Sequence, residues 1–194
     1  MIRFNPIKVV TPSTLEAVSL TEAKEHLRID GDDQNSIVKR YVKAATERCE
    51  NFMQSSIMST EHELYSSNFD SGYSLQKYPV TAVNSVKYYD TDNALQTVAS
   101  SNYRLQDFRQ PCFLEFDTNF DVPDVYEREY PVVINFNAGY ASASTVPSSI
   151  VLGILNELGD ANEFRQNLLT GNGLTVVGIK DGTAGWLNPY TMWV

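Results

Sequence analysis

The sequence has few of the residues that usually form metal sites or nucleophilic centres, with two cysteines and two histidines among 194 residues. Cys49 and Cys112 are far apart, so the chain has no CxxC pair, and it has no HExxH motif. His62 lies between two glutamates on an expected strand, where neighbouring side chains point to opposite faces. His26 lies within an expected helix and is interpreted as a surface or boundary residue. A zinc site is therefore not expected, and two reduced, buried thiols are favoured over a disulfide.

Long apolar stretches are also missing from the sequence. No window approaches the roughly 18 consecutive apolar residues of a transmembrane helix. Residues 1–10 include no long apolar run and no small-residue cleavage site, so a signal peptide is not expected. We therefore expect a protein that is made in the cytoplasm, stays soluble and has no membrane partner.

The sequence has fewer basic than acidic residues. It contains 15 Lys and Arg and 24 Asp and Glu, which gives a formal net charge of −9. The isoelectric point is near 4.7. A protein that clamps DNA by neutralising its phosphates needs clustered cations, so this balance argues against such a clamp. An acidic wall along a channel through which DNA slides is compatible with the same charge.

The familiar catalytic and ligand-binding motifs are not found. The glycine-rich stretch 171–178 lacks GxGxxG spacing and a Lys-Ser/Thr ending, and no helix is expected directly after it. The acidic run 30–33 lacks the glycine and glutamate that a calcium loop requires, because Asn35 and Tyr41 stand at those positions. No GxSxG motif is present. The sequence therefore predicts no enzyme activity, no metal and no cofactor.

Helical periodicity is found near both ends of the sequence. The segment SLTE at 19–22 matches a capping box, so a short helix is expected to begin there and to end near Arg28. The acidic run 30–33 is expected to form a turn and the N-cap of a longer helix over about residues 33–54. A third helix is expected over about residues 147–166, with its proline in the first turn.

Between these helices the period of the sequence changes to two. His62, Leu64 and Ser66 alternate with Glu63 and Tyr65, which predicts a strand. Further strands are expected from β-branched and aromatic content, at about residues 83–89, 95–98, 103–105, 112–116 and 131–138.

These elements predict an α+β protein. Its fold is a small helical bundle, made of the two N-terminal helices and the C-terminal helix, with an inserted antiparallel β block and an extended C-terminal tail. The expected divisions are residues 1–56 and 141–168 for the bundle, 57–140 for the β domain, and 169–194 for a docking tail.

Large apolar and aromatic side chains gather at the end of the chain, at Trp186, Leu187, Tyr190, Met192 and Trp193. Aromatic residues and methionine are enriched at the cores of protein interfaces. A polar, glycine-rich stretch precedes the segment as a tether would. We therefore expect these residues to dock on another chain; the alternative is a strand folded onto the protein's own sheet.

The order of several short motifs resembles a known family. The motifs, in chain order, are SLTEAKEHLR at 19–28, Ala44-Ala45 and Glu50 in the following helix, Tyr78-Pro79-Val80, the strand 83–89 with its turn 90–93, Tyr103-Arg104-Leu105, VINFNAGY at 133–140, and VPSSI at 146–150. This ordered set resembles the head–tail connector, or adaptor, family of tailed bacteriophages over about residues 15–166.

The resemblance implies a structural virion protein in the neck of the particle, assembled in the cytoplasm of the bacterial host. Such adaptors form a ring, usually of twelve copies, beneath the portal. The ring extends the DNA channel, through which DNA passes without sequence-specific binding, and offers a platform to a neck, stopper or tail-completion protein. The C-terminal segment commonly grips the portal, so the resemblance implies portal docking for Trp186, Leu187, Tyr190, Met192 and Trp193.

A ring also needs contacts between subunits. Lys39, Arg40 and Lys43 lie on one face of the expected second helix. We expect this basic face to meet an acidic face of a neighbouring subunit, because heterologous contacts that close into a ring need complementary patches on opposite sides of one protomer. A solvated helix face is the alternative.

Two other classes of function stay open at this point. One is a β-rich virion module that binds a glycan or a receptor through an exposed aromatic row, formed by Tyr88, Tyr89 and Tyr103. The other is a small hydrolase that uses carboxylates of the polar loop at 117–130, although a solvated loop explains those residues equally well. Its candidate residues are Asp117, Asp121 and Asp124.

Overall fold

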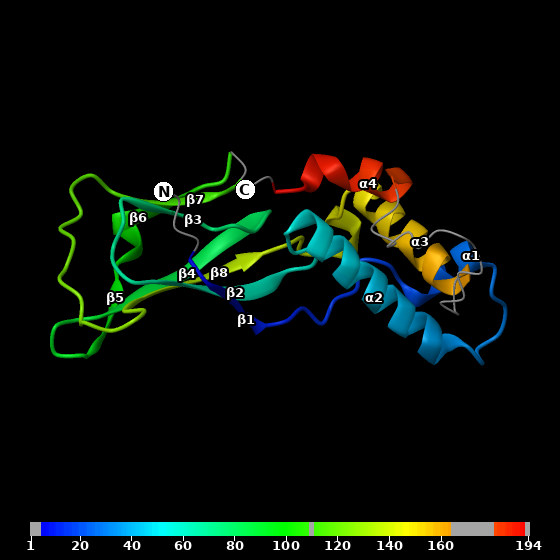
Figure 1. Ribbon diagram of the computed structural model, residues 1–194, viewed down its shortest axis with the longest axis horizontal. Helices are drawn as coiled ribbons and strands as arrows, with labels where there is room; N and C mark the ends of the chain where they lie inside the picture. The colour runs from blue at the N-terminus through cyan, green and yellow to red at the C-terminus, as the bar shows by residue number, and fades with distance from the viewer. Residues whose placement is uncertain (1–4, 109–110, 164–180, 193–194) are drawn as a thin grey trace, which may run out of the picture.

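Four helices form one end of the molecule in the computed structural model, which describes residues 5–108, 111–163 and 181–192. Their bounds are α1 (Leu20–Leu27), α2 (Asn35–Met53), α3 (Ser148–Glu163) and α4 (Asp181–Leu187). Figure 1 shows α1, α2, α3 and α4 packed together at one end, with the strands at the other. Within the described residues, no helix combines the length and the apolar character needed to cross a membrane.

The start and end of α1 follow from local chemistry. The Ser19 side chain accepts a hydrogen bond from the Glu22 backbone N–H at 3.1 Å, as the SLTE motif predicts. Arg28 then adopts a left-handed conformation, and its N–H bonds back to the carbonyls of the last turn. The expected short helix at this position is confirmed.

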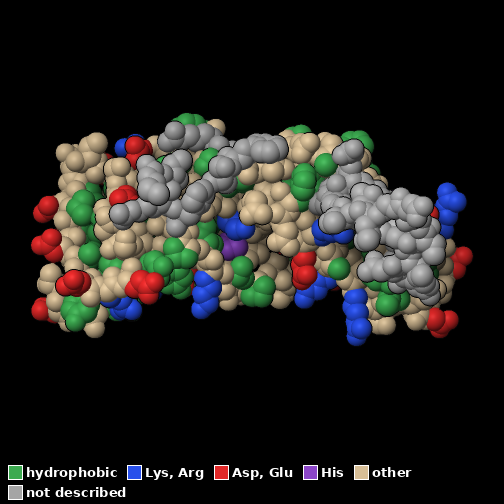
Figure 2. Space-filling model, in the orientation of Figure 1, with side chains coloured by type: hydrophobic (Ala, Val, Ile, Leu, Met, Phe, Trp, Pro, Cys, Tyr) green, Lys and Arg blue, Asp and Glu red, His purple; other side chains and the backbone are tan. Residues whose placement is uncertain are grey.

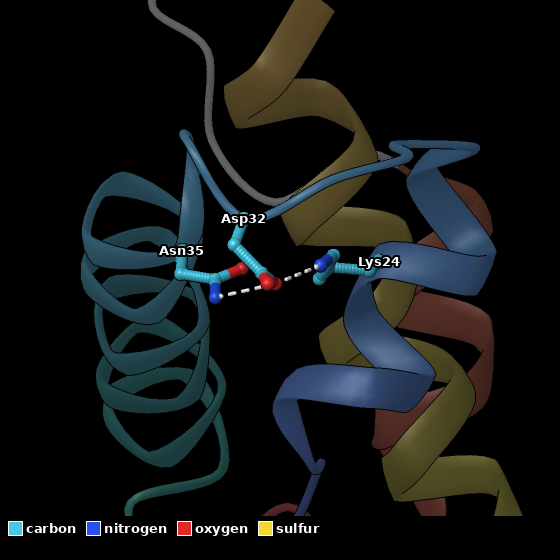
Figure 3. A network of polar contacts seen from close by, with 3 residues as sticks. All are labelled: Lys24, Asp32 and Asn35. Carbon is cyan, nitrogen blue, oxygen red and sulfur yellow. Dashed lines mark hydrogen bonds and ion pairs between the residues drawn. The ribbon is translucent and has the colours of Figure 1, made fainter.

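The acidic run before α2 differs from the expectation. The N-cap of α2 is Gln34, and it makes no side-chain capping bond. Asp32 instead joins the two helices, because its Oδ1 accepts hydrogen bonds from Asn35 Nδ2 at 2.9 Å and from Lys24 Nζ at 3.1 Å (Figure 3). The hydrogen bond from Asn35 and the Lys24 ammonium hold the pKa of Asp32 below its usual value. The carboxylate thus positions the start of α2 against α1.

Strands form the other end of the molecule, in two antiparallel sheets. The larger sheet has the order β1 (Ile7–Thr11), β2 (Thr60–Ser66), β8 (Val132–Ala138), β4 (Val80–Tyr89) and β5 (Leu95–Val98). The smaller sheet has the order β3 (Gly72–Ser74), β7 (Phe113–Phe116) and β6 (Tyr103–Gln106). The predicted α+β class, a helical bundle with an antiparallel β block between its helices in the sequence, is confirmed.

Sequence analysis expects no strand before the first helix, yet β1 pairs with β2 in register Ile7↔Leu64. The four residues of β1 after Ile7 are exposed, so the strand lacks the alternation of apolar and polar residues that marks a half-buried strand. Its place at the edge of the sheet explains this pattern. Residues 7–11, which sequence analysis assigns to the bundle, therefore belong to the larger sheet.

The buried apolar side chains form two separate clusters. One cluster lies among the helices and includes Met53, Ile154 and Leu158. The other lies within the β end and includes Leu114 and Phe136. The interior of the protein is thus divided into a helical core and a β core.

Hydrogen bonds join the two cores at a narrow junction. The Ser55 hydroxyl bonds to the Tyr78 carbonyl and accepts from the Tyr78 N–H. The Tyr140 N–H donates to the Ile57 carbonyl at 2.7 Å. Gly139 has φ of +109°, and a side chain there would collide with the Met58 carbonyl. The chain therefore needs glycine where β8 leaves the sheet.

The described part of the expected docking tail, residues 181–192, folds onto the helical bundle. It contains α4 and a short 3₁₀ turn, Asn188–Tyr190, neither of which sequence analysis predicts. Leu187 is fully buried in the helical core. The Met192 N–H donates to the Met53 carbonyl at 3.0 Å, which ties the segment to the end of α2.

Candidate functional site

A cleft of about 610 Å³ is lined by residues of α2, of β1 and β2, and of the segment that follows β1. One wall is the face of α2 that carries Lys39, Lys43 and Glu47. The opposite wall is formed by Val9 of β1 and the segment 12–16 that follows it. Figure 2 shows a hollow near the middle of one face, in which a histidine and a basic side chain are visible. We treat this cleft as the candidate site because charged, apolar and buried polar side chains all line it.

Helical spacing gives α2 two neighbouring faces. Val38, Val42 and Ala45 are buried in the helical core. Lys39 and Lys43 follow the first two of these residues by one position and therefore lie about 100° further round the helix. Both lysines are exposed, and both line the cleft. The same helix thus packs the core with one face and forms the wall of the cleft with the next.

The three basic residues expected between subunits lie together on this wall. Lys39, Arg40 and Lys43 are all exposed, and all line the cleft. Lys43 Nζ lies 3.9 Å from Glu47 Oε1, and both side chains are largely exposed, so this ion pair contributes little to stability. No ion pair of Lys39 or Arg40 is found within the described residues. Their charges are available to a partner.

The floor of the cleft contains a buried histidine. His62 is 1% exposed, its ring stacks on Phe136 at 5.5 Å between centroids, and its Nε2 lies 2.9 Å from Ser56 Oγ. Burial lowers the pKa of His62 to about 4, with a smaller effect from the charge of Lys77. Its Nδ1 is buried and has no hydrogen-bond partner among the described residues. His62 is therefore neutral at pH 7, with one polar atom unsatisfied.

Glu50 of α2 and Lys77 of the β end also line the cleft. Glu50 Oε1 accepts a hydrogen bond from the Ile57 N–H at 2.7 Å, and burial raises the pKa of Glu50. Lys77 Nζ donates to the Gln54 carbonyl at 3.4 Å, and burial lowers the pKa of Lys77. Both groups are engaged with the backbone of the junction, so their role here is structural.

The Ser56–His62 pair does not have the arrangement of a hydrolase. A catalytic histidine needs a carboxylate on its second ring nitrogen and a pKa near the working pH. His62 Nδ1 has no such partner, and its pKa is far too low. Both side chains are also buried away from solvent. Sequence reasoning does not single out this pair, and its chemistry is that of a core contact.

The carboxylates considered for a hydrolase also lie apart from any site. Asp117 Oδ1 accepts hydrogen bonds from the backbone and side chain of Asn119, as in a local turn. Asp121 and Asp124 are exposed in the loop that follows. No group of three or more histidine, cysteine, aspartate or glutamate residues within the described chain is placed to hold a metal ion.

The tyrosines considered for glycan binding do not form an open row. Tyr88 and Tyr103 are partly buried and pack against the β core. The guanidinium of Arg128 lies over the Tyr89 ring, 4.0 Å from its centroid. Their rings are therefore already used within the protein, and this weighs against the glycan-binding alternative.

The C-terminal residues expected to dock on a portal take different positions. Trp186 is 45% exposed, whereas Leu187 and Met192 are buried in the protein itself. Tyr190 is partly buried and packs against the helical core. Trp193 lies outside the described residues. Leu187 and Met192 thus cannot reach a partner from this conformation, because Leu187 points into the helical core from α4 and Met192 is buried and tied to Met53.

Comparison with known proteins decides the family. The family model for phage gp6-like head-tail connector proteins matches residues 17–120, more than half of the chain. The chain belongs to this family. The resemblance stated from its motifs is confirmed, and the connector is a structural protein of the head–tail junction of a phage-like particle rather than an enzyme. A search of curated proteins gives no match to it.

Solved structures share the fold of this connector over nearly its whole length. A chain in the neck of an empty gene transfer agent (GTA) particle computed with C6 symmetry has a TM-score of 0.78. Chains in the virion of the native particle and in its neck computed with C12 symmetry have TM-scores of 0.76 and 0.74. In each case the sequence identity is 19%, and the match covers 97% of this chain and 96% of the other. At this identity the likeness shows the fold.

Proposed function

We propose that this connector assembles as a ring of twelve copies beneath the portal, where it extends the DNA channel and offers a platform to a neck, stopper or tail-completion protein. The observation that carries the proposal is the match with a chain in a particle neck computed with C12 symmetry, which covers nearly all of both chains. Membership of the head–tail connector family supports the same position in the particle.

The charge of the protein suits a passage for DNA. Each chain has a formal net charge of −9, so twelve copies carry −108. The share of this charge that faces the channel repels the phosphates of DNA, so the double helix passes without adhering to the wall. DNA is then a passenger of the ring and is not bound in a sequence-specific manner.

The exposed ring of Trp186 is the side chain of the C-terminal segment best placed to reach the portal. It lies on α4, whose neighbouring residue Leu187 anchors the helix in the core. An indole presented on an anchored helix loses little conformational freedom on binding, which is typical of residues that dominate an interface. We therefore propose that Trp186 contacts the portal, together with the exposed part of the Tyr190 side chain.

The test is reconstitution of the full chain with its portal protein, followed by electron microscopy of the complex. The tag belongs at the N-terminus, because the C-terminal segment is the proposed docking end. A second ring bound to the portal ring, with twelve-fold symmetry, is the expected result. A connector that binds no portal, or binds a glycan or receptor instead, would overturn the proposal.

One pair of variants tests the docking residue. Trp186→Ala is expected to reduce portal capture at least about tenfold, as expected for truncation of an interface anchor. Phe108→Ala removes an aromatic ring from the β end that is more exposed than Trp186, 78% against 45%, and is expected to have no effect. Truncation before α4 is a poorer test, since it also removes Leu187 from the helical core. Equal portal capture by both variants would place docking elsewhere.

A further inference from the structure

We propose that the cleft between α2 and β1 receives the acidic loop, residues 121–130, of a second copy of the chain. The inference rests on the proposed ring and names the two surfaces that would join its subunits. In this contact the basic residues of α2 meet the acidic loop of the neighbouring copy.

The α2 wall of the cleft carries more basic than acidic side chains. Lys39 and Lys43 are one helical turn apart, and like charges at that spacing repel each other. Lys39 and Arg40 form no ion pair within the described part of the chain, and the contact of Lys43 with Glu47 is long and exposed. Glu16, Glu47 and Glu50 also line the cleft, so its four basic residues, Lys39, Arg40, Lys43 and Lys77, exceed the acidic ones by one. A partner with carboxylates would balance the exposed basic side chains of α2.

The opposite wall of the cleft carries exposed apolar side chains. Val9 is 49% exposed and Leu15 is 52% exposed, and both line the cleft. Exposed apolar side chains beside a hollow mark surfaces that bind other proteins. The cleft therefore suits a segment that is both acidic and apolar.

The acidic loop has this composition. It carries exposed carboxylates together with apolar side chains that are also exposed. The carboxylates are Asp121, Asp124, Glu127 and Glu129. The apolar side chains are Val122, 56% exposed, Tyr126, 40% exposed, and Tyr130, 37% exposed. Its charge complements the lysines of α2, and its apolar side chains complement Val9 and Leu15.

The C-terminal half of the loop is also anchored to the β end. The Tyr126 N–H donates to the Tyr89 carbonyl at 2.9 Å, and the Tyr89 N–H donates to the Pro131 carbonyl at 3.0 Å. The guanidinium of Arg128 stacks over the Tyr89 ring in a cation–π contact. Because this half of the loop is already ordered, binding through it loses less conformational entropy.

The two surfaces lie in different parts of the protein. The acidic loop connects β7 to β8 and runs along the end of the molecule opposite the helices, whereas the cleft lies beside α2 (Figure 1). One chain therefore presents its loop to a neighbour and offers its own cleft to another. Such head-to-tail contacts generate closed rings when the rotation between subunits closes.

A charge-swap experiment with the full chain and its portal protein tests the inference. Lys39→Glu with Lys43→Glu reverses the cleft, and Glu127→Lys with Glu129→Lys reverses the loop. Each double variant alone sets like charges against each other, so ring formation at low salt is expected to fall at least about tenfold. An equimolar mixture of the two restores opposite charges at every contact and is expected to form rings of alternating subunits. Electron microscopy and native mass spectrometry count the copies.

The controls separate the possible failures. Asp92→Lys reverses an exposed charge in the turn between β4 and β5 and is expected to leave the rings intact. If the wild-type chain forms no ring on the portal, the proposed function fails. If wild-type rings form and the reversals leave them unchanged, or the mixture does not restore assembly, this inference alone fails. Loss of portal binding on cleft reversal, with rings intact, would assign the cleft to the portal and also overturn it.

Discussion

Gly153 of α3 lies directly against Leu187 of α4, so closely that a methyl group at Gly153 would be 2.8 Å from Leu187 Cδ2. Leu187 is fully buried, so its side chain has little room to move. The absence of a side chain at Gly153 is therefore what allows α4 to pack on the bundle. This contact fixes the segment that carries Trp186.

Gly153→Ala is expected to lower the free energy of unfolding by about 1 kcal/mol, because overpacking costs about 1–3 kcal/mol and the better helix propensity of alanine offsets part of it. Gly185→Ala in α4 is the matched control, since nothing lies within 4 Å of the added methyl group. Urea unfolding measures both. In a protein that already carries Leu187→Ala, Gly153→Ala should no longer lower the free energy of unfolding. Equal stability of Gly153→Ala and Gly185→Ala would contradict the contact.

Arg48→Met is expected to destabilise the bundle by about 1–3 kcal/mol, as for loss of a charged hydrogen bond. Arg48 Nε lies 2.9 Å from Glu157 Oε2, and the Glu157 side chain is only 4% exposed. Arg40→Met, on the same helix but without an ion pair in the described residues, is the control and should change stability by less than about 0.5 kcal/mol. Adding Glu157→Leu should recover part of the loss in thermal or urea unfolding, since both polar partners are then removed.

Acidification is expected to destabilise the protein through His62. Its pKa is about 4 in the folded protein and about 6.5 when unfolded, so the unfolded chain takes up the proton first. The stability that neutral His62 contributes is complete above pH 6.5 and is lost as the pH falls towards 4. In His62→Gln the free energy of unfolding should fall less between pH 7 and pH 5. The raised pKa of Glu50 affects stability in the opposite direction, but Glu50 is present in both proteins, so its effect cancels in the comparison. Identical pH dependence of the wild type and His62→Gln would contradict the assignment to His62.

Both thiols are expected to be inert in the folded protein. Cys49 and Cys112 are free and fully buried, and burial raises the pKa of both thiols, that of Cys49 to about 12. Because the thiolate is the reactive form, a colorimetric thiol reagent at pH 8 should label neither quickly in the native state and both in denaturant. Thr14→Cys, at an exposed position, provides the rapid control. Fewer than two reactive thiols in denaturant would indicate a disulfide.

Elements with a strong local signal could be predicted from the sequence. The capping box at Ser19 gives the start of α1, and the alternating burial of β8 follows from the alternation of its residues. The acidic loop before β8 is likewise polar in the sequence and exposed in the structure. In these cases the local pattern and the final environment agree, as expected for a sequence with little internal conflict.

Elements held by distant contacts could not be predicted. β1 is an exposed edge strand, so its residues have no periodic pattern, and only the pairing with β2 reveals it. α4 has the sequence DGTAGWL, with two glycines that disfavour a helix, and it forms because Leu187 fits against Gly153. The cleft needs both β1 and α2, which explains why sequence reasoning found the lysines of one wall and not the wall that faces them.

The division into two cores also determines how the protein responds to mechanical force. Within the described residues, three stretches of backbone cross from the β end to the helices, at 12–19, 54–59 and 139–147. Pulling the two ends apart would load the covalent backbone, whereas tilting one end against the other would strain the hydrogen bonds of the junction, among them those of Ser55, Lys77 and Tyr140. We therefore expect the protein to resist stretching along its length more strongly than bending at the junction.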